Sequence, residues 1–162
     1  MLLDISTLPP QEVEFLRLVF ESPRNPRHRM LITSFSKTLE FLPPAGNKSE
    51  TRRTWSDCRF TSWAKAWDEG RIYHRAYDIQ ARNGGRCIGL MRLCERPYRQ
   101  RLFSMGLQSL AREGTPCSSI ERFVHDYFEG EFATVVSVIH FDYLPWEALE
   151  QYFGGAHELH PK

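Results

Sequence analysis

Arginine side chains dominate the middle of this 162-residue sequence. Eleven Arg and one Lys lie between positions 52 and 101 against five acidic residues, whereas positions 126–161 carry seven acidic residues and no Lys or Arg. A planar guanidinium suits phosphate binding and base stacking better than an ammonium group does. The pattern therefore favours a phosphate or nucleic-acid ligand. Charge alone leaves open a second interpretation, in which the arginines cover the solvent face of strands and pair with the acidic end.

Six residues of this basic segment are the candidates for contact with a nucleic acid. They are Arg52, Arg53, Trp55, Arg71, Tyr73 and Arg75. The four arginines would bind phosphates, and the two aromatic rings would stack on a base. For Arg53 an ion pair with the acidic end of the chain is an equal alternative. Two further tryptophans, Trp63 and Trp67, recur at helical spacing and are predicted to pack in the core.

Two segments precede the first predicted strand. Residues 6–21 are predicted to form an amphipathic helix, with Pro9 and Pro10 in its first turn and an apolar stripe along one side. Residues 22–29, with the sequence SPRNPRHR, contain two prolines and four basic residues, three Arg and one His, and suit no regular element. This basic connector is interpreted either as an arm that touches RNA or as a solvated linker.

The remaining pattern predicts an α+β domain with a closed or half-closed sheet. Predicted strands cover 29–34, 48–55, 71–79, 85–95 and 133–143, and the Asn83-Gly84 pair predicts a turn before the fourth of them. Predicted helical stretches cover 60–69, 104–112, 118–128 and 145–153. The length and the apolar content suit a single domain with a real core.

The segment Gly46-Asn47-Lys48-Ser49-Glu50-Thr51-Arg52-Arg53 resembles the signature strand of ASCH domains. Later elements follow in the family's order, so that the resemblance spans roughly residues 30–143. It implies a PUA-like β-barrel of about five to six mixed strands with flanking helices, here with an added N-terminal helix. The domain boundaries expected on this basis are 1–29 for the helix and connector, 30–144 for the ASCH domain, and 145–162 for a C-terminal extension.

The resemblance also implies a function. The cleft of such domains is similar to the RNA-binding cleft of PUA domains, so an RNA or a nucleoside derived from it is the expected ligand. Some members of the family are amidohydrolases that deacylate the exocyclic nitrogen of cytidine. Their catalytic Lys, Thr and Glu correspond here to Lys48, Thr51 and Glu113. A ribonuclease, suggested by other members, is a third alternative, and it would use the same Lys and Glu or His74.

The chemistry of such a trio follows from the side chains. A Thr hydroxyl needs a neighbouring base, which Lys48 provides if burial lowers its pKa, and Glu113 would orient that Lys or act on the leaving amine. Residues three apart on a strand face opposite sides, so Lys48 meets Thr51 only if it lies in the loop before the strand. The simpler interpretations are a solvated cation for Lys48, a packing residue for Thr51 and a helix-terminal acid for Glu113.

Several classes of protein are not favoured by the sequence. No window approaches the ~18 unbroken apolar residues of a membrane span, and no leader pattern is readable, so we expect a soluble cytoplasmic protein and a monomer. The four cysteines form no C-x-x-C pair and are expected to be free thiols. His125, His140, His157 and His160 show no ligand spacing, so neither a metal site nor a cofactor is expected.

Overall fold

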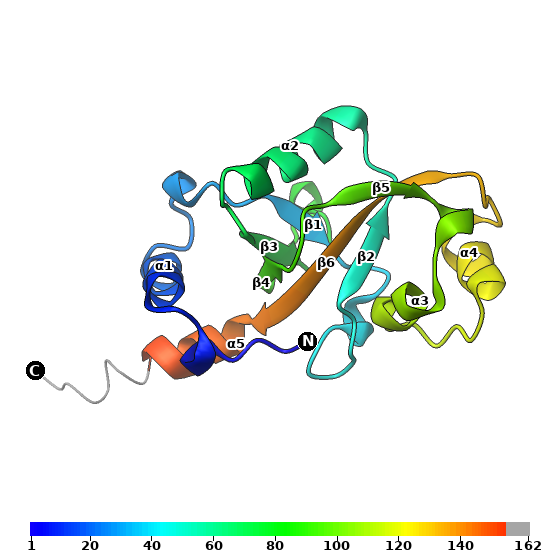
Figure 1. The fold of residues 1–162 in the computed structure, drawn as a ribbon. Helices are drawn as coiled ribbons and strands as arrows, with labels where there is room; N and C mark the ends of the chain where they lie inside the picture. The colour runs from blue at the N-terminus through cyan, green and yellow to red at the C-terminus, as the bar shows by residue number, and fades with distance from the viewer. Residues whose placement is uncertain (155–162) are drawn as a thin grey trace, which may run out of the picture.

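The computed structural model describes residues 1–154 and builds them around one curled, mixed, six-stranded sheet (Figure 1). The strands are β1 (Ile32–Ser34), β2 (Glu50–Arg53), β3 (Tyr73–Tyr77), β4 (Cys87–Leu93), β5 (Tyr98–Arg101) and β6 (Val135–Pro145). Their order is β1-β3-β4-β6-β2, and β5 pairs with β6 beside this path. The β1–β3 pairing is parallel and the other pairings are antiparallel.

The long strand β6 is the spine of the sheet. Its first half pairs with both β2 and β5, and its second half pairs with β4. Side chains alternate between the two faces of a strand, so neighbouring residues of β6 enter different cores. Val136 and Val138 belong to one apolar cluster, whereas Ile139 and Phe141 belong to another. Through this curling, β1 and β2 at the two ends of the strand order both border one open cleft.

Helices cover the sheet at three places. They are α1 (Pro10–Glu21), α2 (Asp57–Asp68), α3 (Leu107–Glu113), α4 (Ile120–Phe128) and α5 (Trp146–Leu149). Helix α2, which is capped by the Ser56 hydroxyl, buries Trp63 in the cluster that contains Phe141. Helices α3 and α4 pack on the Val136 and Val138 side, and α1 and α5 share a third cluster (Figure 1).

The expected fold class is confirmed: the chain is α+β, with the curled half-barrel and flanking helices of a PUA-like barrel and an N-terminal helix. Some boundaries differ. The predicted helix 6–21 is a 3₁₀ turn at Ile5–Thr7 followed by α1 from Pro10, because the Pro9-Pro10 pair suits a helix start and not its interior. The chain turns at residues 94–97 after β4, and the separate strand β5 that follows was not predicted.

The two outer segments of the chain pack together on the sheet. Leu16 and Val19 of α1 join Leu149 and Phe153 in one buried cluster with Leu144 of β6. The division at residues 29 and 144 stays a prediction, and the part of the tail that holds His157 and His160 lies outside the described residues. Across residues 1–154, no helix has the length and apolar character that a bilayer crossing demands.

Candidate functional site

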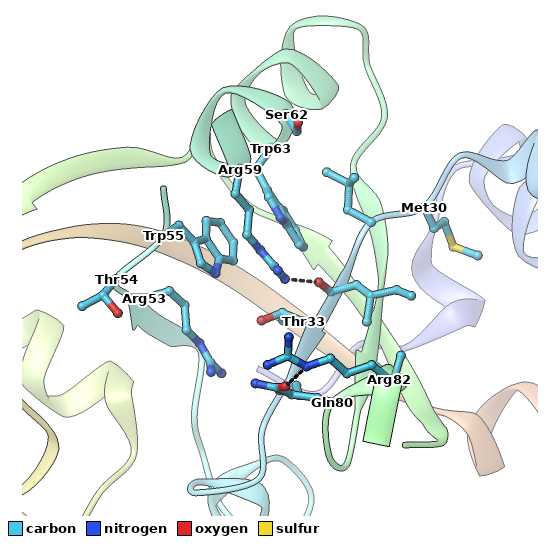
Figure 2. A pocket seen from close by; sticks show the side chains of 14 residues that line it. Met30, Thr33, Arg53, Thr54, Trp55, Arg59, Ser62, Trp63, Gln80 and Arg82 are labelled. Atoms are coloured by element: carbon cyan, nitrogen blue, oxygen red, sulfur yellow. Dashed lines mark hydrogen bonds between the residues drawn. The ribbon is translucent and has the colours of Figure 1, made fainter. Parts of the chain in front are cut away.

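A cleft of about 760 Å³ opens between the two end strands of the sheet. Its walls come from β1, from the end of β2, from α2 and from the turn before β4 (Figure 2). Three arginines, Arg53, Arg59 and Arg82, line it, together with Trp55, Trp63, Gln80 and the β1 residues Thr33 and Ser34. The residues that line this cleft include no Asp or Glu. The cleft therefore concentrates positive charge that its own lining does not neutralise.

Arg53 is the least satisfied of the three cations. Its guanidinium makes no hydrogen bond within residues 1–154, and its Nε is buried without a partner. It lies over the Phe35 ring, 5.1 Å from the ring centre. Burial lowers the pKa of Arg53 to about 10, against a smaller opposing effect of Glu113. Because a buried donor without an acceptor is costly, this side chain suits an anionic ligand that supplies the acceptor.

The other two arginines are tethered. Arg59 donates from Nη2 to the Ile32 carbonyl at 2.7 Å, and Arg82 donates from Nε to Gln80 Oε1 at 2.7 Å. Figure 2 shows the three guanidinium groups turned into the same space, with the Thr33 side chain among them. Both tethered side chains keep further N–H groups, since a guanidinium carries five.

One wall of the cleft is built from aromatic rings that pack on one another. Trp55 stacks on Trp63 with 5.0 Å between ring centres, and Trp63 lies 4.6 Å from the His74 ring. Trp63 is buried, which confirms the prediction that it packs in the core, whereas Trp55 stays partly exposed at the cleft. Arg59 lies over the Trp55 ring at 5.1 Å. The wall thus presents one partly exposed aromatic ring beside three cations.

His74 stands behind this wall as a neutral group. The Leu31 N–H donates to its Nδ1 at 3.0 Å, so its Nε2 carries the proton and donates to the Arg71 carbonyl at 3.0 Å. Burial lowers the pKa of His74 to about 4. With both nitrogens engaged and the ring buried, His74 has no open position for proton transfer to a ligand.

The residues Lys48 and Glu113 meet in a buried ionic cluster outside the cleft lining. Lys48 Nζ lies 3.1 Å from Glu113 Oε1 and donates also to the Glu113 main-chain carbonyl at 3.1 Å. Arg52 pairs with Glu50 at 3.0 Å and approaches Glu113 Oε2 at 3.5 Å. Arg112 reaches Glu50 from the surface at 3.4 Å. We call Lys48, Glu50, Arg52 and Glu113 the buried ionic cluster.

Local structure explains how residues 65 positions apart meet. Helix α3 ends at Glu113, and Gly114 follows with a φ of 72° in the left-handed region that favours glycine. A Cβ at Gly114 would lie 2.9 Å from the Lys48 Cα, so only glycine allows this approach. The Ser49 N–H also donates to the Arg112 carbonyl at 2.7 Å. The end of α3 is therefore fixed against the loop before β2.

The side chain of Lys48 is wholly buried in this environment. Loss of solvation lowers the pKa of Lys48, and the neighbouring Glu113 carboxylate opposes that shift. Thr51 is buried too, but its hydroxyl makes no hydrogen bond to Lys48 or Glu113. Strand alternation explains the separation, because Thr51 shares the Arg53 face of β2 while Glu50 and Arg52 face Glu113. The structure joins two members of the predicted trio and leaves the third apart.

Three predicted contact residues lie against the N-terminal segment instead of the cleft. Arg71 donates to the Arg29 carbonyl at 2.8 Å, and Arg75 donates to the Pro23 carbonyl at 2.5 Å. The Tyr73 hydroxyl donates to Glu12 of α1 at 2.7 Å, and its ring stacks on Phe15. These contacts fix the connector and α1 on the sheet. In this arrangement the buried Tyr73 ring has no face for a base.

Sequence reasoning placed two of its candidates, Arg53 and Trp55, at the cleft and missed its other members. Arg59 and Arg82 belong to the same basic segment, but they lie on α2 and on the turn before β4, where no strand pattern pointed to a ligand. The excess of Arg over acids was the only signal that included them.

Comparison of the chain with protein-family models, with curated proteins and with solved structures found no match in any of the three.

Proposed function

We propose that this protein is an ASCH-type binder of RNA, or of a nucleotide unit derived from it, and that the cleft between β1 and β2 is its binding site. The observation that carries the proposal is the lining of three arginines without a carboxylate. Phosphates are the acceptors that match such a group of guanidinium donors, and their neutralisation supplies a large share of the affinity of proteins for nucleic acids. The resemblance of residues 46–53 to the ASCH signature supports the same ligand class.

The aromatic wall supports a nucleic acid over a simple phosphate. The partly exposed Trp55 ring lies beside the arginines, where a base can stack while its phosphate reaches Arg53. Stacking of one base on an aromatic side chain contributes about 1–3 kcal/mol. Stacking tolerates any base, so we expect weak sequence preference.

The test is fluorescence anisotropy with a labelled single-stranded RNA over a series of salt concentrations. Three arginine contacts to phosphate predict that the logarithm of the binding constant falls with the logarithm of the salt concentration with a slope of about −2. Arg53→Gln should make this slope shallower by about 0.7, and Trp55→Ala should weaken binding about tenfold at every salt concentration. An affinity that is independent of salt would contradict the proposal.

Matched controls separate the cleft from general charge. Arg96→Gln removes the same charge from an exposed pair with Asp68, and Phe103→Ala removes an exposed aromatic ring; neither residue lines the cleft. Both should bind RNA as the unchanged protein does. Denaturing electrophoresis of the same labelled RNA tests the ribonuclease alternative. If the protein is not a ribonuclease, the RNA stays intact.

A second candidate function is hydrolysis of an N4-acylated cytidine by Lys48, Thr51 and Glu113. The observation that favours it is the buried Lys48–Glu113 pair, in which desolvation lowers the pKa of the Lys48 amine and so favours the neutral form that can accept a proton. Thr51 makes no hydrogen bond to Lys48 within residues 1–154, so this reaction requires the two side chains to come together. The Thr51 oxygen would then attack the acyl carbon, its proton would pass to Lys48, and the C–N bond would break as the cytidine amine takes that proton. Water then cleaves the acyl ester.

Chromatography of N4-acetylcytidine incubated with the protein tests this candidate. Release of acetate that Thr51→Ala abolishes and Thr51→Ser retains in part would support it. If no acetate is released over many hours, the hydrolase candidate is wrong. That result would not bear on the RNA-binding proposal, because the cleft lining does not include Thr51.

A further inference from the structure

A second, smaller basic cleft lies beside the first. It encloses about 250 Å³ and has an apolar floor of Val19, Leu90 and Trp146. Three more arginines line it: Arg24 of the connector, Arg75 of β3 and Arg86 just before β4. As in the first cleft, the lining includes no Asp or Glu. Asp78, close to Arg86, accepts the Ile79 and Arg86 main-chain N–H groups and is not among the lining residues.

The two clefts meet at one residue. Met30, at the end of the basic connector, lines both of them. Arg75 of the second cleft donates to the Pro23 carbonyl and so fixes the connector that leads to Met30. Six arginines thus border two adjoining hollows that no lining carboxylate interrupts.

The cations of the second cleft are free to accept a ligand. Neither Arg24 nor Arg86 has a hydrogen bond or ion pair from its guanidinium to any residue in the range 1–154, and both side chains are exposed. Arg75 keeps further N–H groups beyond its bond to Pro23. Unpaired guanidinium groups over an apolar floor suit the alternating phosphates and bases of a nucleic-acid strand.

We propose that the two clefts form one continuous track for a single-stranded polynucleotide, which passes over Met30 and places phosphates on Arg24, Arg75 and Arg86. This inference rests on the proposed function of the first cleft. It adds that the ligand is a strand of several nucleotides and not a mononucleotide. A single nucleotide fills one hollow and leaves the other three cations without an acceptor.

The test is the dependence of affinity on strand length. Labelled oligouridylates of about two and about ten nucleotides are titrated against the full chain. The longer strand should bind at least about tenfold more tightly, because it alone reaches the second cleft. Replacing Arg24 and Arg86 together by Gln should remove most of this advantage, make the salt slope of the longer strand shallower by about 1.4, and leave the binding of the shorter strand unchanged.

The double variant has a matched control. Arg96→Gln with Arg122→Gln removes the same charge from exposed ion pairs outside both clefts. It should keep the preference for the longer strand. Circular dichroism checks that both double variants fold. We expect this because the guanidinium groups of Arg24 and Arg86 have no partner within residues 1–154, and the ion pairs of Arg96 and Arg122 are largely exposed.

Different results overturn different proposals. Equal affinity for both strands, or a longer strand that ignores the loss of Arg24 and Arg86, overturns the track and leaves the first cleft as a nucleotide site. Failure of both strands to bind overturns the proposed function itself. Displacement of the longer strand by polyglutamate at equal charge concentration would also overturn the track, because it would identify the surface as a site for acidic peptides.

Discussion

Two neighbouring arginines of β2 have opposite environments. Arg52 is buried in the ionic cluster, where Glu50, Gln100 and Glu113 receive its N–H groups or lie near them. Arg53, the next residue, turns to the other face of the strand and has no hydrogen-bond partner within the described chain. The cluster contains two cations and two carboxylates, whereas the cleft lining contains three cations and none.

This difference separates structural charge from charge that awaits a ligand. A buried charge is tolerated when its partners are fixed, and removal of one partner then leaves an uncompensated ion in the interior. An unpaired charge at an open cleft contributes little to stability, and a ligand can satisfy it. Composition counts both kinds of arginine alike, so only their partners show which of them belong to a binding site.

The largest effect is expected at the centre of the ionic cluster. Glu113→Gln leaves Lys48 and Arg52 buried with one carboxylate fewer, and we expect it to cost about 3–5 kcal/mol in the free energy of unfolding. Urea denaturation followed by tryptophan fluorescence measures this loss.

Two further variants sharpen the result. Lys48→Met combined with Glu113→Gln removes one charge of each sign and should lose less than Glu113→Gln alone, because the balance of the cluster is kept. Asp68→Asn breaks an exposed pair with Arg96 and should cost under about 1 kcal/mol. A loss of similar size for Asp68→Asn and Glu113→Gln would show that the cluster is not a fixed structural unit.

More of the fold than of the candidate site could be predicted from the sequence. Alternation and turn residues indicated β2, β3, β4 and β6, since these are local signals that adjacent residues encode. The same alternation would have sent Arg52 and Arg53 to opposite faces, although both were predicted to touch the nucleic acid. Strand parity says which residues share a face, but it does not say which face is open.

Other features depend on contacts between distant segments. Tyr73 was predicted to stack on a base, and the packing of α1 over β3 that buries it is not readable from the strand itself. Lys48 and Glu113 are in contact although they lie 65 positions apart in the sequence. Gly114, which permits this contact, reads in the sequence only as a glycine that ends a helix. Position within the fold, and not residue type, decided these outcomes.

An intermediate effect is expected from His74, a buried polar group that supports the cleft wall. Its pKa is lowered to about 4 by burial, below the 6.5 of an exposed histidine. Below pH 6.5 the unfolded chain therefore binds more protons than the folded chain, and stability falls as the pH drops toward 4. Between pH 7.5 and pH 5 this group should cost about 2 kcal/mol.

The measurement combines urea unfolding at the two pH values with NMR titration of the His74 ring in the folded protein. The ring should stay neutral down to about pH 5, because protonation of Nδ1 would break its bond from the Leu31 N–H. A His74 ring that titrates near 6.5 would show that the wall behind the cleft is open to water, and the contrast between the cleft and the protected interior would then fail.

The smallest effect on stability is expected at the residue that matters most for binding. Arg53→Gln loses no hydrogen bond to any residue of the described chain. It gives up a contact with Phe35 worth about 0.5–1 kcal/mol and removes a poorly solvated charge. These contributions oppose one another, so the free energy of unfolding should stay within about 1 kcal/mol of the unchanged protein while RNA affinity falls.

Arg52→Gln is the matched control, since it removes the same charge one residue away. It should destabilise the fold by several times that amount, because Glu50 loses its buried partner. If the two substitutions destabilise the protein equally, Arg53 has a structural role and the cleft loses its main claim to an anionic ligand.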